Sequence, residues 1–144
     1  MKIFKILFFI ISIINVTKGM SQNIASHQWK NRVLLIITDD SDSITFQNQI
    51  KTLQTHENGL TDRKLIVYQI KKHSYTTGLK DEEWKDSSKL YKIFKTANTP
   101  FEVILIGLDG GIKLRQSDLL TCEALFSTID VMPMRKEALK RKNK

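Results

Sequence analysis

The sequence predicts an α/β fold in which a central mixed sheet is flanked by helices. Two apolar segments, residues 33–38 and 65–70, are short and rich in β-branched residues, as is typical of strands buried on both faces. Apolar residues between and after them recur at helical spacing. Residues 101–115 contain two further strand-like segments around a glycine pair, which predicts an antiparallel hairpin because glycine accepts the positive φ of a tight turn.

The first half of the predicted domain is a β-α-β unit. After the strand at residues 33–38, the apolar positions follow a helical period from residue 44 until Asn58-Gly59, a pair typical of a helix end. Ser41 or Asp42 is expected to cap the start of this helix. The strand at residues 65–70 follows, and strands joined through a helix are expected to lie parallel.

The second half completes the order β-α-β-α-β-β-α, which is that of the thioredoxin fold. Residues 73–85 are polar and contain Gly78, so we expect a loop with a turn of helix around Trp84. A second helix, capped near Asp86 or Ser87, follows from one apolar stripe. The stripe consists of Leu90, Ile93, Phe94 and Ala97. After the hairpin, the last helix is expected over residues 121–130.

The first 21 residues predict a secretory signal peptide. Lys2 and Lys5 precede an apolar run, and small residues at Gly19 and Ser21 offer cleavage sites. The run is shorter than the about 20 apolar residues that a membrane-spanning helix requires. We therefore expect a protein secreted into the periplasm or the extracellular space.

Charge divides the mature chain into a neutral domain, residues 27–134, and a basic tail, residues 135–144. Residues 20–134 contain 14 basic and 14 acidic residues, whereas the tail holds six basic residues against Glu137. The total of +8 therefore does not indicate a nucleic-acid partner, and export argues against one as well. A terminal charge run of this kind is typically solvated and disordered. The alternative for the tail is contact with anionic polymers or membrane headgroups.

Three parts of the sequence resemble the DUDES family, which is found in exported bacterial proteins and in vertebrate sushi-repeat-containing proteins and is catalogued as a domain of unknown function. They are WKNR followed by VLLIIT, the hairpin LIGLDGGIKLR, and the ending ALFSTIDVMPMRKE. The resemblance implies a thioredoxin- or peroxiredoxin-like fold without its reactive cysteine and carries no established activity. The motif positions are Trp29, Arg32, Asp109, Gly110, Gly111, Lys113, Arg115, Met132, Pro133, Met134 and Arg135.

The position of the thioredoxin nucleophile reads TDDSDS in this sequence. Thiol oxidoreductases place their attacking cysteine there, at the start of the helix after the first strand. Aspartate and serine cannot form a mixed disulfide. Cys122 is the only cysteine, and it shares an apolar stripe with Leu125 and Ile129, so we expect a buried thiol. The alternative is a displaced reactive thiol at Cys122, serving an oxidoreductase or peroxidase.

No cofactor is expected, because the residues for one are not arranged in a binding motif. Asp39, Asp40 and Asp42 are interpreted as cap and dipole partners of the following helix, with a weak cation site as the alternative. The three histidines are scattered without metal-ligand spacing, which argues against zinc.

Basic motif residues suggest an anion-binding site as a further hypothesis. Lys113 and Arg115 alternate with apolar residues along one strand and therefore share a face. If they converge with Arg32 or Arg135, they form a patch suited to carboxylate, sulfate or phosphate. Otherwise each side chain meets solvent or a carboxylate of its own. We predict a secreted, non-enzymatic domain that binds a protein or an extracellular anionic polymer.

Overall fold

The computed structural model describes residues 22–96 and 98–144, so the predicted signal peptide lies outside the described residues. A six-stranded sheet forms the centre of the molecule, with strand order β4-β3-β2-β1-β5-β6. Its strands are β1 (Arg32–Thr38), β2 (Leu65–Ile70), β3 (Ser74–Thr77), β4 (Lys85–Asp86), β5 (Phe101–Ile106) and β6 (Ile112–Gln116).

The sheet is mixed, as predicted, with β1 at its centre. β1 runs parallel to β2 and antiparallel to β5. The register pairs Arg32 with Leu65 at the amino end of β1, and Thr38 with Phe101 at its carboxyl end. All seven residues of β1 are buried, which explains why this segment carries apolar residues without alternation.

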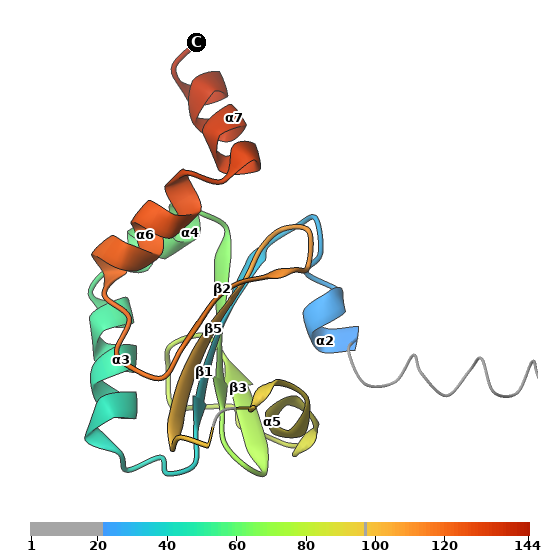
Figure 1. Ribbon diagram of the computed structural model, residues 1–144, viewed down its shortest axis with the longest axis vertical. Coiled ribbons are helices and arrows are strands. Elements are labelled where there is room, and N and C mark those ends of the chain that lie inside the picture. Colours follow the sequence, from blue (N-terminus) through green and yellow to red (C-terminus); the bar gives the residue numbers. More distant parts are fainter. Residues whose placement is uncertain (1–21, 97) are drawn as a thin grey trace, which may run out of the picture.

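Helices cover both faces of the sheet (Figure 1). Alternate residues of β1 enter two cores, with Leu34 and Ile36 on the face of α3 and α6, and Leu35 and Ile37 on the other face. Within the described residues, no helix combines the length and the apolar character needed to cross a bilayer. The helices are α2 (Gln22–Ala25), α3 (Ile44–Gln54), α4 (Glu57–Asp62), α5 (Lys89–Phe94), α6 (Cys122–Asp130) and α7 (Pro133–Lys142).

The predicted helix end at Asn58-Gly59 is wrong, because these two residues lie inside α4. The first helix, α3, ends earlier, at Gln54, and Ser43 rather than Ser41 or Asp42 caps its start. Gly59 serves helix packing: a Cβ atom there would lie 2.6 Å from the ring of Phe126 in α6. The absence of a side chain at position 59 therefore makes room for a residue that is distant in the sequence.

The predicted loop over residues 73–85 instead contains β3, which pairs antiparallel with β2 and with the short β4. Trp84 lies outside any helix, and its indole N–H donates to Asp81 Oδ1 at 2.6 Å. The second predicted helix is α5, which begins after Ser88 and ends at Phe94. Ala97, the last position of its expected apolar stripe, lies outside the described residues.

The predicted hairpin is confirmed, with β5 and β6 paired around a turn in which Gly110 has a φ of 82°. The carboxylate of Asp109 accepts a hydrogen bond from the Gly111 amide at 3.0 Å and stabilises this turn.

The predicted disorder of the tail is wrong, because most of it forms α7. Pro133 occupies the start of this helix, a position where its fixed φ and missing N–H are tolerated. Folded structure also extends beyond the predicted boundaries of residues 27–134. Ile24, before the predicted start, is 7% exposed, and Arg135, after the predicted end, is 5% exposed.

Candidate ligand-binding groove

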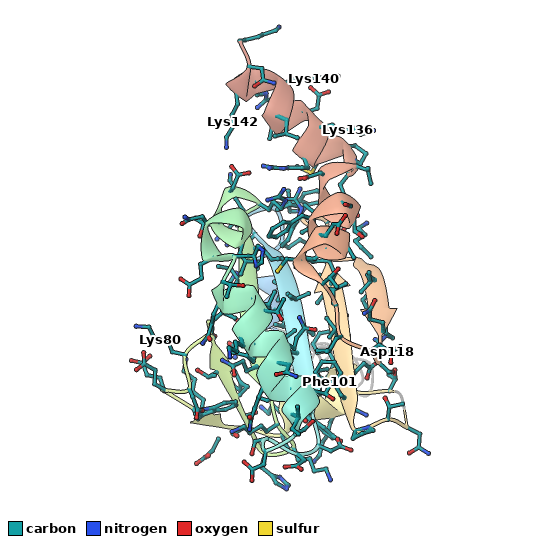
Figure 2. All side chains as sticks on the ribbon, turned by 90° about the vertical axis from the view of Figure 1, so that its left-hand side faces the viewer. Lys80, Phe101, Asp118, Lys136, Lys140 and Lys142 are labelled. Carbon is teal, nitrogen blue, oxygen red and sulfur yellow. The ribbon has the colours of Figure 1, made fainter. Side chains whose placement is uncertain are left out.

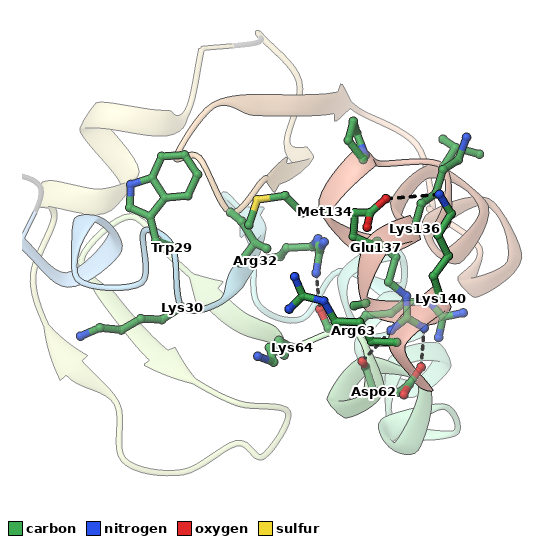
Figure 3. A pocket seen from close by; sticks show the side chains of 16 residues that line it. Trp29, Lys30, Arg32, Asp62, Arg63, Lys64, Met134, Lys136, Glu137 and Lys140 are labelled. Atoms are coloured by element: carbon green, nitrogen blue, oxygen red, sulfur yellow. Dashed lines mark hydrogen bonds and ion pairs between the residues drawn. The ribbon is translucent and has the colours of Figure 1, made fainter. Parts of the chain in front are cut away.

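A groove of about 650 Å³ lies at the end of the sheet where β1 and β2 begin (Figure 3). Its walls come from four segments that are far apart in the sequence. They are the residues before and at the start of β1, the end of α4 with its connection to β2, Leu108 after β5, and Val131 together with α7. The groove exists only because the fold brings these segments to one end of the sheet.

The charged residues that line this groove are predominantly basic. The lining contains eight basic and two acidic side chains. This end of the molecule is therefore positive, although the predicted domain has equal numbers of basic and acidic residues. Figure 2 shows Lys136, Lys140 and Lys142 of α7 at the opposite end of the molecule from Phe101. The basic lining residues are Lys30, Arg32, Arg63, Lys64, Arg135, Lys136, Lys140 and Arg141, and the acidic ones are Asp62 and Glu137.

Apolar side chains form the rest of the lining. Trp29, Val131 and Met134 are 62%, 64% and 50% exposed, which is unusual for large apolar residues. Trp29 is held by its backbone, whose N–H donates to the carbonyl of Leu108 at 2.7 Å. Met132 differs from Met134 because it packs against the core.

Arg32 is a buried cation at the groove. Its side chain is attached to β1, and the residue is only 3% exposed. Nη1 donates to the carbonyl oxygen of Arg63 at 2.8 Å, whereas the buried Nε has no hydrogen-bond partner. Burial, together with the nearby charge of Arg135, holds the pKa of the Arg32 guanidinium below its usual value, against the attraction of Asp130. A buried N–H without an acceptor is costly, and the Arg32 guanidinium therefore lacks a full set of hydrogen-bond partners within the described part of the chain.

Two carboxylates at this end of the molecule, Asp130 and Asp62, are engaged by other cations. Asp130 accepts two hydrogen bonds from Arg63, at 3.0 and 2.7 Å, and one from Arg135 Nε at 3.0 Å. Asp62 pairs with Arg135 and with Lys142 of α7. The network ties α7 and α6 to α4, and it leaves Arg32 without a carboxylate of its own.

These contacts make Asp62 a determinant of acid stability. Hydrogen bonds from Lys142 and Arg135 lower the pKa of Asp62 from 3.8 to about 2. A carboxyl group with a lowered folded-state pKa contributes stability above its unfolded pKa, and that contribution disappears as the pH falls through the folded value. We therefore expect the wild-type urea midpoint to fall between pH 4 and pH 2 more steeply than that of Asp62→Asn. Parallel curves would contradict this role of Asp62.

The four predicted anion-binding residues do not converge. Lys113 pairs with Asp109 at 2.8 Å, and Arg115 pairs with the buried Glu102. Each of these two cations therefore pairs with a carboxylate of its own, as in the alternative to the anion-binding patch. Only Arg32 and Arg135 of the set line the groove. Sequence reasoning missed other lining residues, among them Lys30, Arg63 and Lys64, because no local pattern links them.

The aspartates of the TDDSDS segment lie at the opposite end of β1 from the groove. Asp39 accepts a hydrogen bond from the Tyr91 hydroxyl, which raises the pKa of Tyr91 to about 12. Asp40 accepts from the backbone N–H of Asp42 at 2.9 Å. Within residues 22–96 and 98–144, no group of three His, Cys, Asp or Glu side chains is placed to hold a metal ion.

Cys122 is buried at the start of α6, as the sequence predicts, and is 5% exposed. Its thiol lies 3.6 Å from the carbonyl oxygen of Thr52 within the core that contains α3. Burial raises the pKa of this thiol, which disfavours the reactive thiolate.

A family model described as a domain of unknown function (DUF4174) matches residues 23–138. The chain belongs to this family. The match covers every segment that builds the groove up to Ala138, including Trp29, Arg32 and Arg135. No curated protein matches this DUF4174 chain.

The fold of the DUF4174 chain is similar to that of a solved peroxiredoxin. The crystal structure of reduced Plasmodium vivax 2-Cys peroxiredoxin aligns with a TM-score of 0.58 and 12% sequence identity. The alignment covers 79% of this chain and 84% of that chain. This likeness confirms the predicted thioredoxin-like architecture of a mixed sheet flanked by helices. At this identity it supports the fold alone.

Proposed function

We propose that this chain is an exported, thioredoxin-like recognition domain that binds a protein or an extracellular anionic polymer through the basic groove. We further propose that the domain acts without thiol chemistry and that it is a member of the DUDES family. Export rests on the charge and apolar pattern of residues 1–21. Binding rests on the positive groove, with its buried cation and exposed apolar residues.

The observation that carries this proposal is the placement of the single thiol. Cys122 is in the core between α3 and α6, whereas the corner after β1 presents aspartates. Thiol exchange and peroxide reduction require an accessible thiolate. A scaffold that keeps this fold and encloses its thiol is suited to binding.

We expect the native protein to react with Ellman's reagent at least about tenfold more slowly than after unfolding in urea, because the thiol is enclosed and its pKa is raised. The same protein is expected to reduce neither insulin disulfides nor hydrogen peroxide above the background of a Cys122→Ser variant. The measurements are the rate of thiol labelling and the rate of reductant consumption.

The second candidate is a thiol-dependent oxidoreductase or peroxidase that uses Cys122. One observation favours it, namely that Cys122 is the first residue of α6, where helix amides stabilise a thiolate. Rapid labelling of the native protein, together with turnover that disappears in Cys122→Ser, would establish this candidate and exclude the recognition domain.

A further inference from the structure

We infer that the groove binds a peptide segment of a protein partner, in which an acidic residue lies next to a large apolar one and the carboxylate rests on Arg32. This inference rests on the proposed function and narrows its ligand to one chemical class. Three features support it: a buried cation, an apolar rim, and the lack of uncharged polar side chains among the described residues that line the groove.

The buried cation supplies the anchor for the carboxylate. Arg32 is 3% exposed, and its Nε has no acceptor. The carboxylate of Asp130, whose charge acts on Arg32, is engaged by Arg63 and Arg135. Figure 3 shows the Arg32 side chain between Trp29 and the residues of α7. A planar guanidinium group matches the two oxygens of a carboxylate, and a ligand carboxylate would neutralise a charge that the chain itself leaves unpaired.

The rim supplies a surface for an apolar side chain next to that carboxylate. Trp29 precedes β1, whereas Val131 and Met134 lie at the junction of α6 and α7, yet all three line the groove and are at least half exposed. Gathered apolar exposure of this kind is typical of interaction sites. Tryptophan is enriched among the residues that dominate binding energies, and methionine adapts its shape to a partner.

The lining favours a peptide over a polysaccharide. Among the described residues that line the groove there is no Ser, Thr, Asn, Gln, Tyr or His. A sugar hydroxyl both donates and accepts hydrogen bonds, and the two carboxylates of the lining that could accept from it, Asp62 and Glu137, are already engaged by lysine and arginine side chains. A peptide with acidic and apolar side chains uses both kinds of lining, while the surrounding lysines steer its approach.

The test measures the affinity of the purified protein for a fluorescein-labelled peptide of alternating glutamate and leucine. We expect Arg32→Met to raise Kd by about tenfold to a hundredfold, since a hydrogen bond to a charged group is lost. Trp29→Gly is expected to raise Kd about tenfold. Its φ of 65° suits glycine, so this variant removes the ring without straining the fold. The control Lys51→Gln removes a charge from an exposed position of α3, outside the groove, and is expected to change Kd less than about twofold.

Two altered peptides and a sugar complete the test. Peptides with glutamine for glutamate or serine for leucine should each bind at least about tenfold more weakly. Absent peptide binding, or binding insensitive to Trp29→Gly and to the serine peptide, overturns the inference. Tighter, Arg32-dependent binding of a heparin fragment also overturns it and replaces the peptide by a polysaccharide. If Arg32→Met does not fold, the affinities of Trp29→Gly and of the glutamine and serine peptides decide whether the inference holds.

The outcomes separate this inference from the proposed function on which it rests. If the peptide does not bind, while thiol labelling is slow and neither peroxide nor insulin is reduced, the proposed ligand class alone is overturned. Peroxide or disulfide reduction that depends on Cys122 overturns the proposed function, whatever the peptide does.

Discussion

Replacing Arg115 with methionine is expected to lower the free energy of unfolding by about 3 kcal/mol. The side chain of Glu102 is completely buried in β5, and Arg115 Nη1 donates a hydrogen bond to its carboxylate. Methionine keeps most of the aliphatic stem but removes the cation. Because Arg115 itself is 31% exposed, we expect a loss at the lower end of the range for broken buried pairs. Urea unfolding monitored by tryptophan fluorescence measures the change.

Lys113 provides the matched control on the same strand. Lys113 also pairs with a carboxylate, but both partners are partly exposed, at 35% and 47%. We expect Lys113→Met to cost less than about 0.5 kcal/mol, as is usual for surface ion pairs. Adding Glu102→Gln to Arg115→Met should recover part of the lost stability, because no charge then remains buried. Equal losses in Lys113→Met and Arg115→Met would show that the burial of Glu102 does not decide the effect.

Replacing Arg135 with methionine is expected to lower the free energy of unfolding by about 2 kcal/mol and to release α7 from the domain. Arg135 is 5% exposed, donates to Asp130 Oδ1 and to the carbonyl of Asp62 at 3.0 Å each, and pairs with the Asp62 carboxylate. The carboxylates remain about one-third exposed, so water compensates part of the loss. The pKa of Arg135 is raised despite its burial, because Asp62 and Asp130 stabilise its charge.

Hydrogen exchange and urea unfolding together measure this effect. Amides of α7 should lose protection in Arg135→Met, while those of β1 keep it until global unfolding. The control is Lys136→Met, which changes the adjacent, exposed position of the same helix and should alter stability by less than about 0.5 kcal/mol. Unchanged protection of α7 in Arg135→Met would mean that other contacts hold this helix.

The central part of the fold could be predicted because its sequence patterns are local. Continuous apolar runs identified β1 and β2, and the Asp109-Gly110-Gly111 turn identified the hairpin. β3 and β4 were missed because they are short and polar, and they are stabilised by pairing with β2 and with each other. Gly59 was misread because its reason is Phe126, which is distant in the sequence.

The groove was predicted only in part. The sequence singled out Arg32 and Arg135, which line it, but also Lys113 and Arg115, which are engaged by Asp109 and Glu102. Nothing in the local pattern separates a cation with a carboxylate partner from one without, because that difference depends on which segments meet. The predicted burial of Cys122 succeeded because its apolar neighbours recur at helical spacing.

The sequence by itself determined the main buried strands, the hairpin and the aspartates in place of cysteine in the segment after the first strand. Backbone geometry and burial are encoded in spacing over a few residues. The tertiary structure alone decided where the positive charge gathers and that Arg32 remains without a carboxylate. Ion pairing acts over a few ångströms between residues such as Asp62 and Arg135, which are 73 positions apart, so only the folded chain assigns each charge its partner.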